Sequence, residues 1–117
     1  MAYMLLVVEK LGDRAARSPS EGLALYDRML RFSADLQERG QLTLSQSLKT
    51  DVQGVRVTRQ GDKSMVRDGP FAETKEMIGG FFLLTCETRE QALEIARACP
   101  AAEWATIEVR ELGPCFQ

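Results

Sequence analysis

The sequence predicts an α+β fold with a ferredoxin-like, split βαβ sheet that carries an inserted β-hairpin. Three observations lead to this fold class. The unbroken apolar runs Tyr3–Val8 and Phe81–Leu84 are typical of central strands whose two faces are both buried. Two longer segments have the apolar spacing of amphipathic helices. Two further segments alternate apolar with polar residues, as edge strands do, so the predicted order is β-α-β, hairpin, β-α-β.

The first helix has a clear start after the strand at Tyr3–Val8. Ser18 can cap it, Pro19 suits its first position, and Glu21 completes a capping box. One apolar stripe then follows at helical spacing. Its members are Leu25, Met29, Phe32 and Leu36. Gly40 is expected to end the helix, because glycine favours the left-handed conformation that follows a last helical turn.

The middle of the chain predicts an edge strand and a hairpin. Leucines alternate with polar residues from Leu42 to Leu48, which predicts a strand with one dry face. The segments Val55–Arg59 and Lys63–Arg67 flank a Gln-Gly-Asp turn at residues 60–62, and this arrangement predicts a β-hairpin.

The last third predicts a strand, a helix and a final strand. Phe81–Leu84 is the second strand that we expect to be apolar on both faces. Thr88 and Gln91 form a second capping box, and Pro100 ends the helix that they start. Residues 104–110 then alternate, which predicts the second edge strand.

Two helices are enough to cover only one face of such a sheet. With the first and third strands at the centre, the other face would expose alternate residues of Tyr3–Val8 and Phe81–Leu84. An apolar patch of this kind rarely stays in contact with water. At about 25 cal/mol per Å², a few hundred Å² correspond to several kcal/mol in favour of association. We therefore expect a homodimer that packs through its sheet faces.

The composition predicts one cytoplasmic domain. The 117 residues, taken as a single domain over 1–117, can bury roughly two-thirds of their unfolded surface. A net charge of −2 argues against nucleic acid as a partner, because nucleic-acid binding needs a basic face. The run Met4–Val8 is too short to span a membrane and lacks the flanks of a signal peptide. Three cysteines without a CxxC spacing agree with a reducing compartment.

The absence of histidine from the sequence restricts the chemistry. It excludes Ser-His-Asp triads and histidine general bases, and it removes the commonest transition-metal ligand. The cysteines, Cys86, Cys99 and Cys115, do not have a zinc-binding spacing. We therefore expect no metal and no cofactor, and any acid–base chemistry must come from Asp, Glu, Lys, Tyr or Cys.

The segment DGPFAETKE, at residues 68–76, is the most informative part of the chain. It places four ionisable side chains beside a Gly-Pro pair, and these are Asp68, Glu73, Lys75 and Glu76. As a functional hypothesis, Asp68, Glu73 and Lys75 are candidate catalytic residues. Burial of Asp68 against Phe71 would favour its proton-donating form, so that it can act as a general acid or base. Glu73 and Lys75 share one face of an extended segment and can bind a polar substrate and transfer a proton.

Neighbouring residues are candidates for ligand binding. These candidates are Gly69, Pro70, Phe71, Glu76 and Gly80. Phe71 can stack on a ligand, or it can anchor the dimer core. The pair Gly79–Gly80 can let a ligand approach the backbone closely, or it can mark a β-bulge or tight packing at the start of a strand.

The ionisable residues also have a structural interpretation. Asp68 can form an Asx turn with the backbone that follows it. Glu73 and Lys75 can form an ion pair within or between subunits, and Glu76 can pair with an arginine. The sequence leaves the functional and the structural interpretations open.

The DGPFAETKE segment, followed by Gly79-Gly80-Phe81, resembles the signature of the DGPF proteins within the wider YCII-related family. The resemblance extends over almost the whole chain and includes Met29–Phe32 and the pair Cys99-Pro100. It implies a single YCII-related domain and a dimeric α+β barrel of ferredoxin-like subunits. It also implies a small bacterial protein of a kind that is often found alongside extracytoplasmic-function sigma factors.

The better-described YCII-type proteins are proposed to use a His-Asp pair in the dimer cleft. This chain lacks histidine, so only Asp68 offers a counterpart. Two function hypotheses follow. In the first, the protein binds a small polar ligand in a dimer cleft beside the Asp68–Glu76 loop and performs cofactor-independent acid–base chemistry. In the second, it is a non-catalytic regulatory or interaction module that works with a sigma factor.

Overall fold

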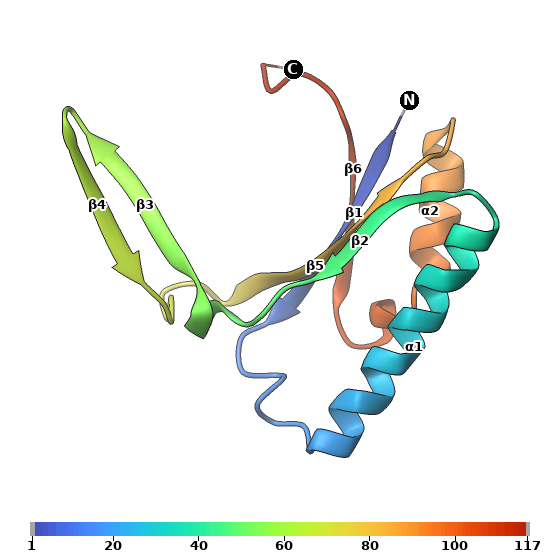
Figure 1. Cartoon of the computed structure of the whole chain (residues 1–117), viewed down its shortest axis with the longest axis horizontal. Helices are drawn as coiled ribbons and strands as arrows, with labels where there is room; N and C mark the ends of the chain where they lie inside the picture. Colours follow the sequence, from blue (N-terminus) through green and yellow to red (C-terminus); the bar gives the residue numbers. More distant parts are fainter. Residues whose placement is uncertain (1, 117) are drawn as a thin grey trace.

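The computed structural model describes residues 2–116 as a four-stranded antiparallel sheet, a separate hairpin and two α-helices (Figure 1). The sheet order is β2-β5-β1-β6, with β1 and β5 at the centre. The elements are β1 (Tyr3–Lys10), α1 (Pro19–Glu38), β2 (Leu42–Ser47), η1 (Asp51–Gln53), β3 (Val55–Gln60), β4 (Lys63–Asp68), β5 (Glu76–Leu84), α2 (Arg89–Ala98), η2 (Pro100–Glu103) and β6 (Thr106–Glu111). The predicted ferredoxin-like fold with its inserted hairpin, β3-β4, is confirmed. None of the helices in this described part of the chain is long and apolar enough to cross a membrane.

Both helices begin at the capping boxes that the sequence predicts. Ser18 Oγ accepts a hydrogen bond from the Glu21 N–H at 3.2 Å, and the Glu21 carboxylate accepts one from the Ser18 N–H at 3.0 Å. Thr88 and Gln91 repeat this arrangement at the start of α2. After α1 the chain turns at Gly40, which has a φ of +69°, as expected for a glycine that follows a helix.

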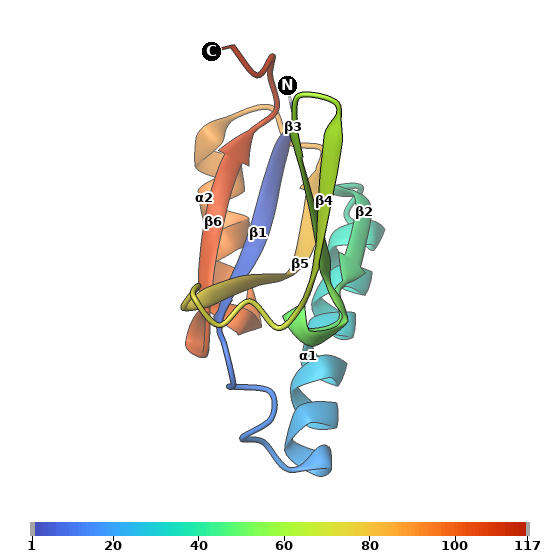
Figure 2. The ribbon, with the colours of Figure 1, turned by 90° about the vertical axis from the view of Figure 1, so that its left-hand side faces the viewer.

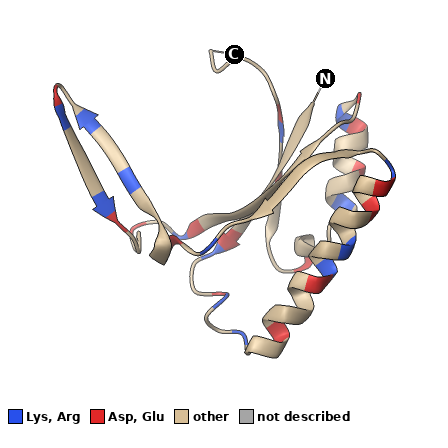
Figure 3. Cartoon of the chain, viewed as in Figure 1, with Lys and Arg blue, Asp and Glu red and all other residues tan. Residues whose placement is uncertain are grey.

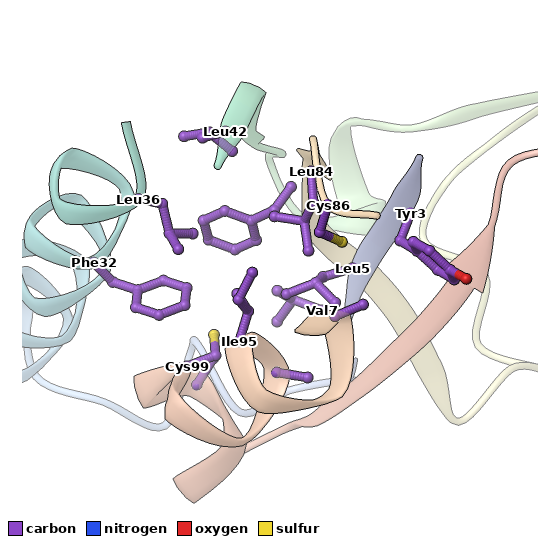
Figure 4. Packing of buried hydrophobic residues seen from close by; sticks show 14 residues of the cluster. Tyr3, Leu5, Val7, Phe32, Leu36, Leu42, Leu84, Cys86, Ile95 and Cys99 are labelled. Atoms are coloured by element: carbon purple, nitrogen blue, oxygen red, sulfur yellow. The ribbon is translucent and has the colours of Figure 1, made fainter. Parts of the chain in front are cut away.

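The helices cover the same face of the sheet, and the hydrophobic core lies between them and the strands (Figures 1 and 4). Leu5, Leu36 and Leu84 are completely buried there. The rings of Phe32 and Phe82 meet edge to face, with 5.5 Å between their centroids. The other buried members of the cluster are Tyr3, Val7, Leu42, Cys86, Ala92, Ile95, Ala96, Cys99 and Ala101.

The three cysteines differ in their burial. Cys86 and Cys99 are buried in the core, and burial raises the pKa of both thiols. Both therefore act as small apolar side chains. Cys115 is exposed on the segment that follows β6.

Three strand details differ from the prediction. The leucines of β2 do not share one dry face, because the register shifts between Leu42 and Leu44, and Leu42 is buried while Leu44 is exposed. β5 begins at Glu76 instead of Phe81, because residues 76–78 pair with the end of β1 from Val8 to Lys10. Glu76 therefore belongs to the sheet and not to the preceding loop. The sequence also predicts that β1 is buried on both faces, but in a single chain only alternate residues of β1 are buried. The residues between them are half-buried, because no helix covers their face.

The helix-free face of the sheet and the hairpin are open to solvent in a single chain. The hairpin projects away from the sheet in Figure 1 and lies in front of it in Figure 2, and every residue of β3 and β4 is exposed. Exposed large apolar side chains on the hairpin and the sheet are Leu44, Val55, Val57, Met65, Val66 and Ile78. The Cα radius of gyration is 16.0 Å, whereas a compact domain of this length has about 13 Å. A single chain therefore leaves much apolar surface uncovered.

Candidate functional site

Glu9 is a charged residue on the buried face of β1. Because side chains alternate along a strand, Glu9 points to the same helix-covered face as Leu5 and Val7. It is only 6% exposed, and within residues 2–116 it is the only polar or charged residue that is buried. An unpaired carboxylate in this position would cost several kcal/mol. Arg14 supplies the counter-charge.

Arg14 lies in the loop between β1 and α1 and holds Glu9 with two nitrogens. Nε donates to Glu9 Oε1 at 2.9 Å and Nη2 donates to Oε2 at 2.6 Å, which makes a bidentate ion pair. Nη1 also donates to the Leu48 carbonyl at 2.7 Å, and Nη2 donates to the Gly79 carbonyl at 3.1 Å. One guanidinium thus joins this loop to β1, to the residue after β2 and to β5.

Two glycines of β5 leave the space that this ion pair occupies. The pairing of β5 with β1 skips Gly79, which therefore forms a β-bulge. A Cβ atom at Gly79 would lie 1.5 Å from Glu9 Oε2, far inside normal contact. At Gly80 it would lie 2.9 Å from the carbonyl oxygen of Gln46 on β2. The bulge and tight packing considered for this pair are confirmed, and the ion pair beside them explains the need for glycine at the first position.

A pocket of about 420 Å³ lies beside the ion pair on the helix-covered side of the sheet. It is bounded by α1 from Gly22 to Ser33, the loop before this helix, strands β1, β2 and β5, and η2. Half of the Tyr26 and Leu30 surfaces remain exposed at its rim. Pockets that bind small molecules have volumes of roughly 300–1,000 Å³, so this one is large enough to hold a ligand.

The pocket has a charged end and a mainly apolar body. Glu9, Arg14 and Arg17 line the charged end, and Figure 3 shows the basic residues of this loop beside the start of α1. The hydroxyls of Ser33 on α1 and Ser45 on β2 also line the pocket and lie 3.2 Å apart. Apolar walls with a few polar groups are typical of small-molecule sites.

The DGPFAETKE segment folds into a tight turn at the base of the hairpin. The Gly69 N–H donates to the Gly54 carbonyl at 2.8 Å, and a Cβ atom at Gly69 would lie 1.9 Å from the Asp51 carbonyl oxygen. The peptide bond before Pro70 is cis. The Phe71 N–H donates to Asp51 Oδ2 at 3.0 Å, and the Phe71 side chain is buried. Glycine and buried phenylalanine are therefore needed here for packing.

Asp68 ends β4 and is exposed to solvent. The Asx turn suggested for it does not form, because the residue two positions later is Pro70, which has no N–H to donate. The carboxylate of Asp51, on η1, instead accepts the hydrogen bond from Phe71. Lys75 is also exposed, and its carbonyl accepts a hydrogen bond from the Leu11 N–H at 3.0 Å.

Glu73 is held by two arginines of the hairpin. It accepts hydrogen bonds from Arg67 and from Arg56, the second at 3.3 Å. The Cζ atoms of Arg56 and Arg67 lie 3.9 Å and 5.2 Å from the centre of the Phe71 ring, so both cations face the ring. A backbone hydrogen bond lowers the pKa of Glu73, and the hydrogen bond from Arg67 lowers it further. In this arrangement the ion-pair partners of Glu73 are arginines and not Lys75.

A second hollow of about 420 Å³ opens beside this segment, on the helix-free face of the sheet. Phe71 and Glu76 line it, whereas Gly80 lines the helix-side pocket. The other predicted site residues are described by the structure but line neither cavity. These are Asp68, Gly69, Pro70, Glu73 and Lys75. The structure thus divides the predicted site residues between two faces of the sheet and the solvent.

Sequence reasoning missed Glu9, Arg14 and Arg17. The predicted strand ends at Val8, but Glu9 lies inside β1 and faces the core. The signal that could have found it is its phase, because Glu9 continues the alternate positions of β1 that point inward. Arg14 and Arg17 lie in a loop, where no helix or strand periodicity predicts which way a side chain points.

The YCII-related domain matches residues 1–115 of the chain. The chain belongs to the YCII-related family. An uncharacterised protein, R00369 from Rhizobium meliloti (strain 1021), is 36% identical over 115 residues, which is 97% of this chain and 93% of that protein.

A solved structure has the same fold as this YCII-related protein. It is the 5-chloro-2-hydroxyhydroquinone dehydrochlorinase TftG from Burkholderia phenoliruptrix AC1100, in complex with 2,5-dihydroxybenzoquinone. The TM-score is 0.54, and the match covers 97% of this chain and 94% of that chain. With 12% sequence identity, the similarity establishes the fold and does not transfer individual residues.

The bulge glycine offers a direct test of this site. We predict that Gly79→Ala lowers the free energy of unfolding by about 1–3 kcal/mol, because its methyl group overlaps the buried ion pair. Urea denaturation measures this change. Gly113→Ala is the matched control, since a Cβ atom there meets nothing within 4 Å. Equal stability of the two variants would show that the ion pair does not occupy the place described.

Proposed function

We propose that this YCII-related protein is a homodimer that binds a small polar organic ligand in the helix-side pocket. The observation that carries the proposal is the buried Glu9–Arg14 pair at the charged end of a pocket of about 420 Å³. A buried ion pair contributes little net stability compared with apolar side chains of similar volume. Ionisable groups that line a cavity are therefore better explained by a binding site than by folding alone.

The structural neighbour TftG supports this proposal at the level of the fold. TftG was solved with 2,5-dihydroxybenzoquinone, a small polar ring compound. A protein chain with the same architecture can thus hold a molecule of this size. The present chain has no histidine, so its ligand contacts must come from other groups, and the lining arginines and serines are suitable donors.

The alternative location is the dimer cleft beside the Asp68–Glu76 loop. The hollow lined by Phe71 and Glu76 would lie at the seam if a second copy covered the helix-free face. The loop itself, however, commits Glu73 to two arginines and buries Phe71 beneath them. These contacts favour a bracing role for the loop, so we place the ligand in the helix-side pocket. A catalytic role for Asp68, Glu73 and Lys75 remains a prediction.

The homodimer is proposed from the uncovered surface of a single chain. The projecting hairpin carries Val57 and Val66, each more than half exposed and paired across the two strands. The helix-free face of the sheet adds Leu44 and Ile78, each nearly half exposed. A second copy that packs on this face and contacts the hairpin would remove these side chains from water.

The location of the ligand can be tested with variants of each site. A fragment library screened by protein-observed NMR should give binders whose shifts map to the helix-side pocket. We predict that Ser45→Leu, which narrows this pocket, weakens these binders at least about tenfold. Asp68→Asn and Lys75→Met should leave their affinity unchanged, because these exposed side chains do not line the pocket.

The reverse result, with loss of binding in the loop variants only, would place the site in the dimer cleft. A screen without any binder in either cavity would reject ligand binding. It would favour the second hypothesis, a non-catalytic interaction module with a partner such as a sigma factor.

The dimer has its own test. Light scattering at micromolar concentration should give twice the chain mass of 13.1 kDa. Val57→Asp on the hairpin should shift the protein toward the monomer, because it places a charge in the proposed interface. Leu23→Asp is the control, since Leu23 is similarly exposed, at 61%, but lies on α1. A wild-type protein that stays at 13.1 kDa would contradict the proposal.

A further inference from the structure

We infer that the helix-side pocket selects a small organic anion with an apolar or aromatic body. This inference rests on the proposed function and specifies its ligand. The acidic group of the ligand would lie at Arg17, and its body would pack toward Tyr26 and Trp104. The two ends of the pocket provide the separate lines of support.

The charge at the loop end of the pocket is unbalanced. Glu9, Arg14 and Arg17 all line it, and the first two neutralise each other in a bidentate pair. Arg17 is half-buried, and no carboxylate of residues 2–116 lies within ion-pair distance of it. One positive charge therefore remains at the pocket.

Glu21 is the acidic residue that interacts electrostatically with Arg17, although the two side chains do not form an ion pair. Arg17 contributes to lowering the pKa of Glu21, but hydrogen bonds from the backbone and side chain of Ser18 contribute more. The Glu21 carboxylate thus belongs to the helix cap, and Glu21 does not line the pocket. Arg17 can pair with a ligand without breaking a contact that the fold uses.

Arg14 can add a second hydrogen bond to the same ligand group. A guanidinium carries five N–H donors. Four of these bond to Glu9, Leu48 and Gly79, and the donor that remains is on Nη1. Two guanidinium groups at one end of a cavity are suited to a carboxylate or a similarly acidic oxygen pair. A cationic ligand would meet net repulsion there, because the carboxylate of Glu9 is already paired.

The rest of the pocket sets the chemistry of the ligand's body. Tyr26, Met29 and Trp104 supply apolar and aromatic walls, which an inorganic anion would not use. The hydroxyls of Ser33 and Ser45 can each donate to or accept from a polar substituent. An aromatic or similarly flat organic acid can contact the arginines, the aromatic walls and the two hydroxyls together. The pocket volume of about 420 Å³ limits the ligand to a small molecule.

The test compares three benzene derivatives of similar size that differ in charge. Benzoate, the isosteric neutral amide benzamide and the cation benzylamine are titrated into the native protein and followed by NMR shifts of the pocket residues. Benzoate should bind at least about tenfold more tightly than benzamide, and benzylamine should be weaker than both. Arg17→Gln should reduce the preference for benzoate to about twofold without changing the affinity for benzamide.

Arg97→Gln on α2 is the matched control, because Arg97 is exposed and does not line the pocket, and it should keep the full preference for benzoate. Equal binding of benzoate and benzamide to the native protein would overturn the anion inference but leave the proposed function intact. A preference for benzoate that persists in Arg17→Gln would also overturn it. If none of the probes and no library fragment binds in the pocket, the proposed function fails together with the inference.

Discussion

The buried ion pair between Glu9 and Arg14 is the constraint on which the rest of the site depends. A carboxylate on the inward face of a central strand needs a cationic partner. In this protein an arginine of the following loop is that partner. Arg14 meets this need and also donates to the carbonyls of Leu48 and Gly79. The loop before α1, the end of β2 and the bulge in β5 are consequently fixed relative to one another. The pocket is the space that this framework leaves beneath α1.

A second cluster of charges braces the opposite part of the molecule. Arg56 and Arg67 face each other across the hairpin, cover the ring of Phe71 and share the carboxylate of Glu73. These contacts fix the hairpin at its base while its strands stay exposed. The segment with the most distinctive sequence thus has a clear structural task. The pocket with the more suitable chemistry lies on the other side of the sheet.

The sequence was sufficient to predict the fold, because local signals agree with one another. Capping boxes such as the one at Ser18, the run of Tyr3–Val8 and the hairpin turn each define one element, and their order leaves few topologies. The pocket could not be predicted in the same way. Arg14 and Glu9 are only five positions apart in the chain, but the contact of Arg14 with Gly79 spans 65 positions. Only the folded sheet brings a loop arginine to a glycine in β5.

The central claim is that Glu9 and Arg14 act as one unit. A double-mutant cycle measures this most directly, with Glu9→Gln, Arg14→Met and the double variant compared by urea denaturation. The account predicts a coupling energy of about 2 kcal/mol or more, because either single change leaves its partner without a counterpart. Effects that add to within about 0.5 kcal/mol would contradict it, since independent residues behave in that way.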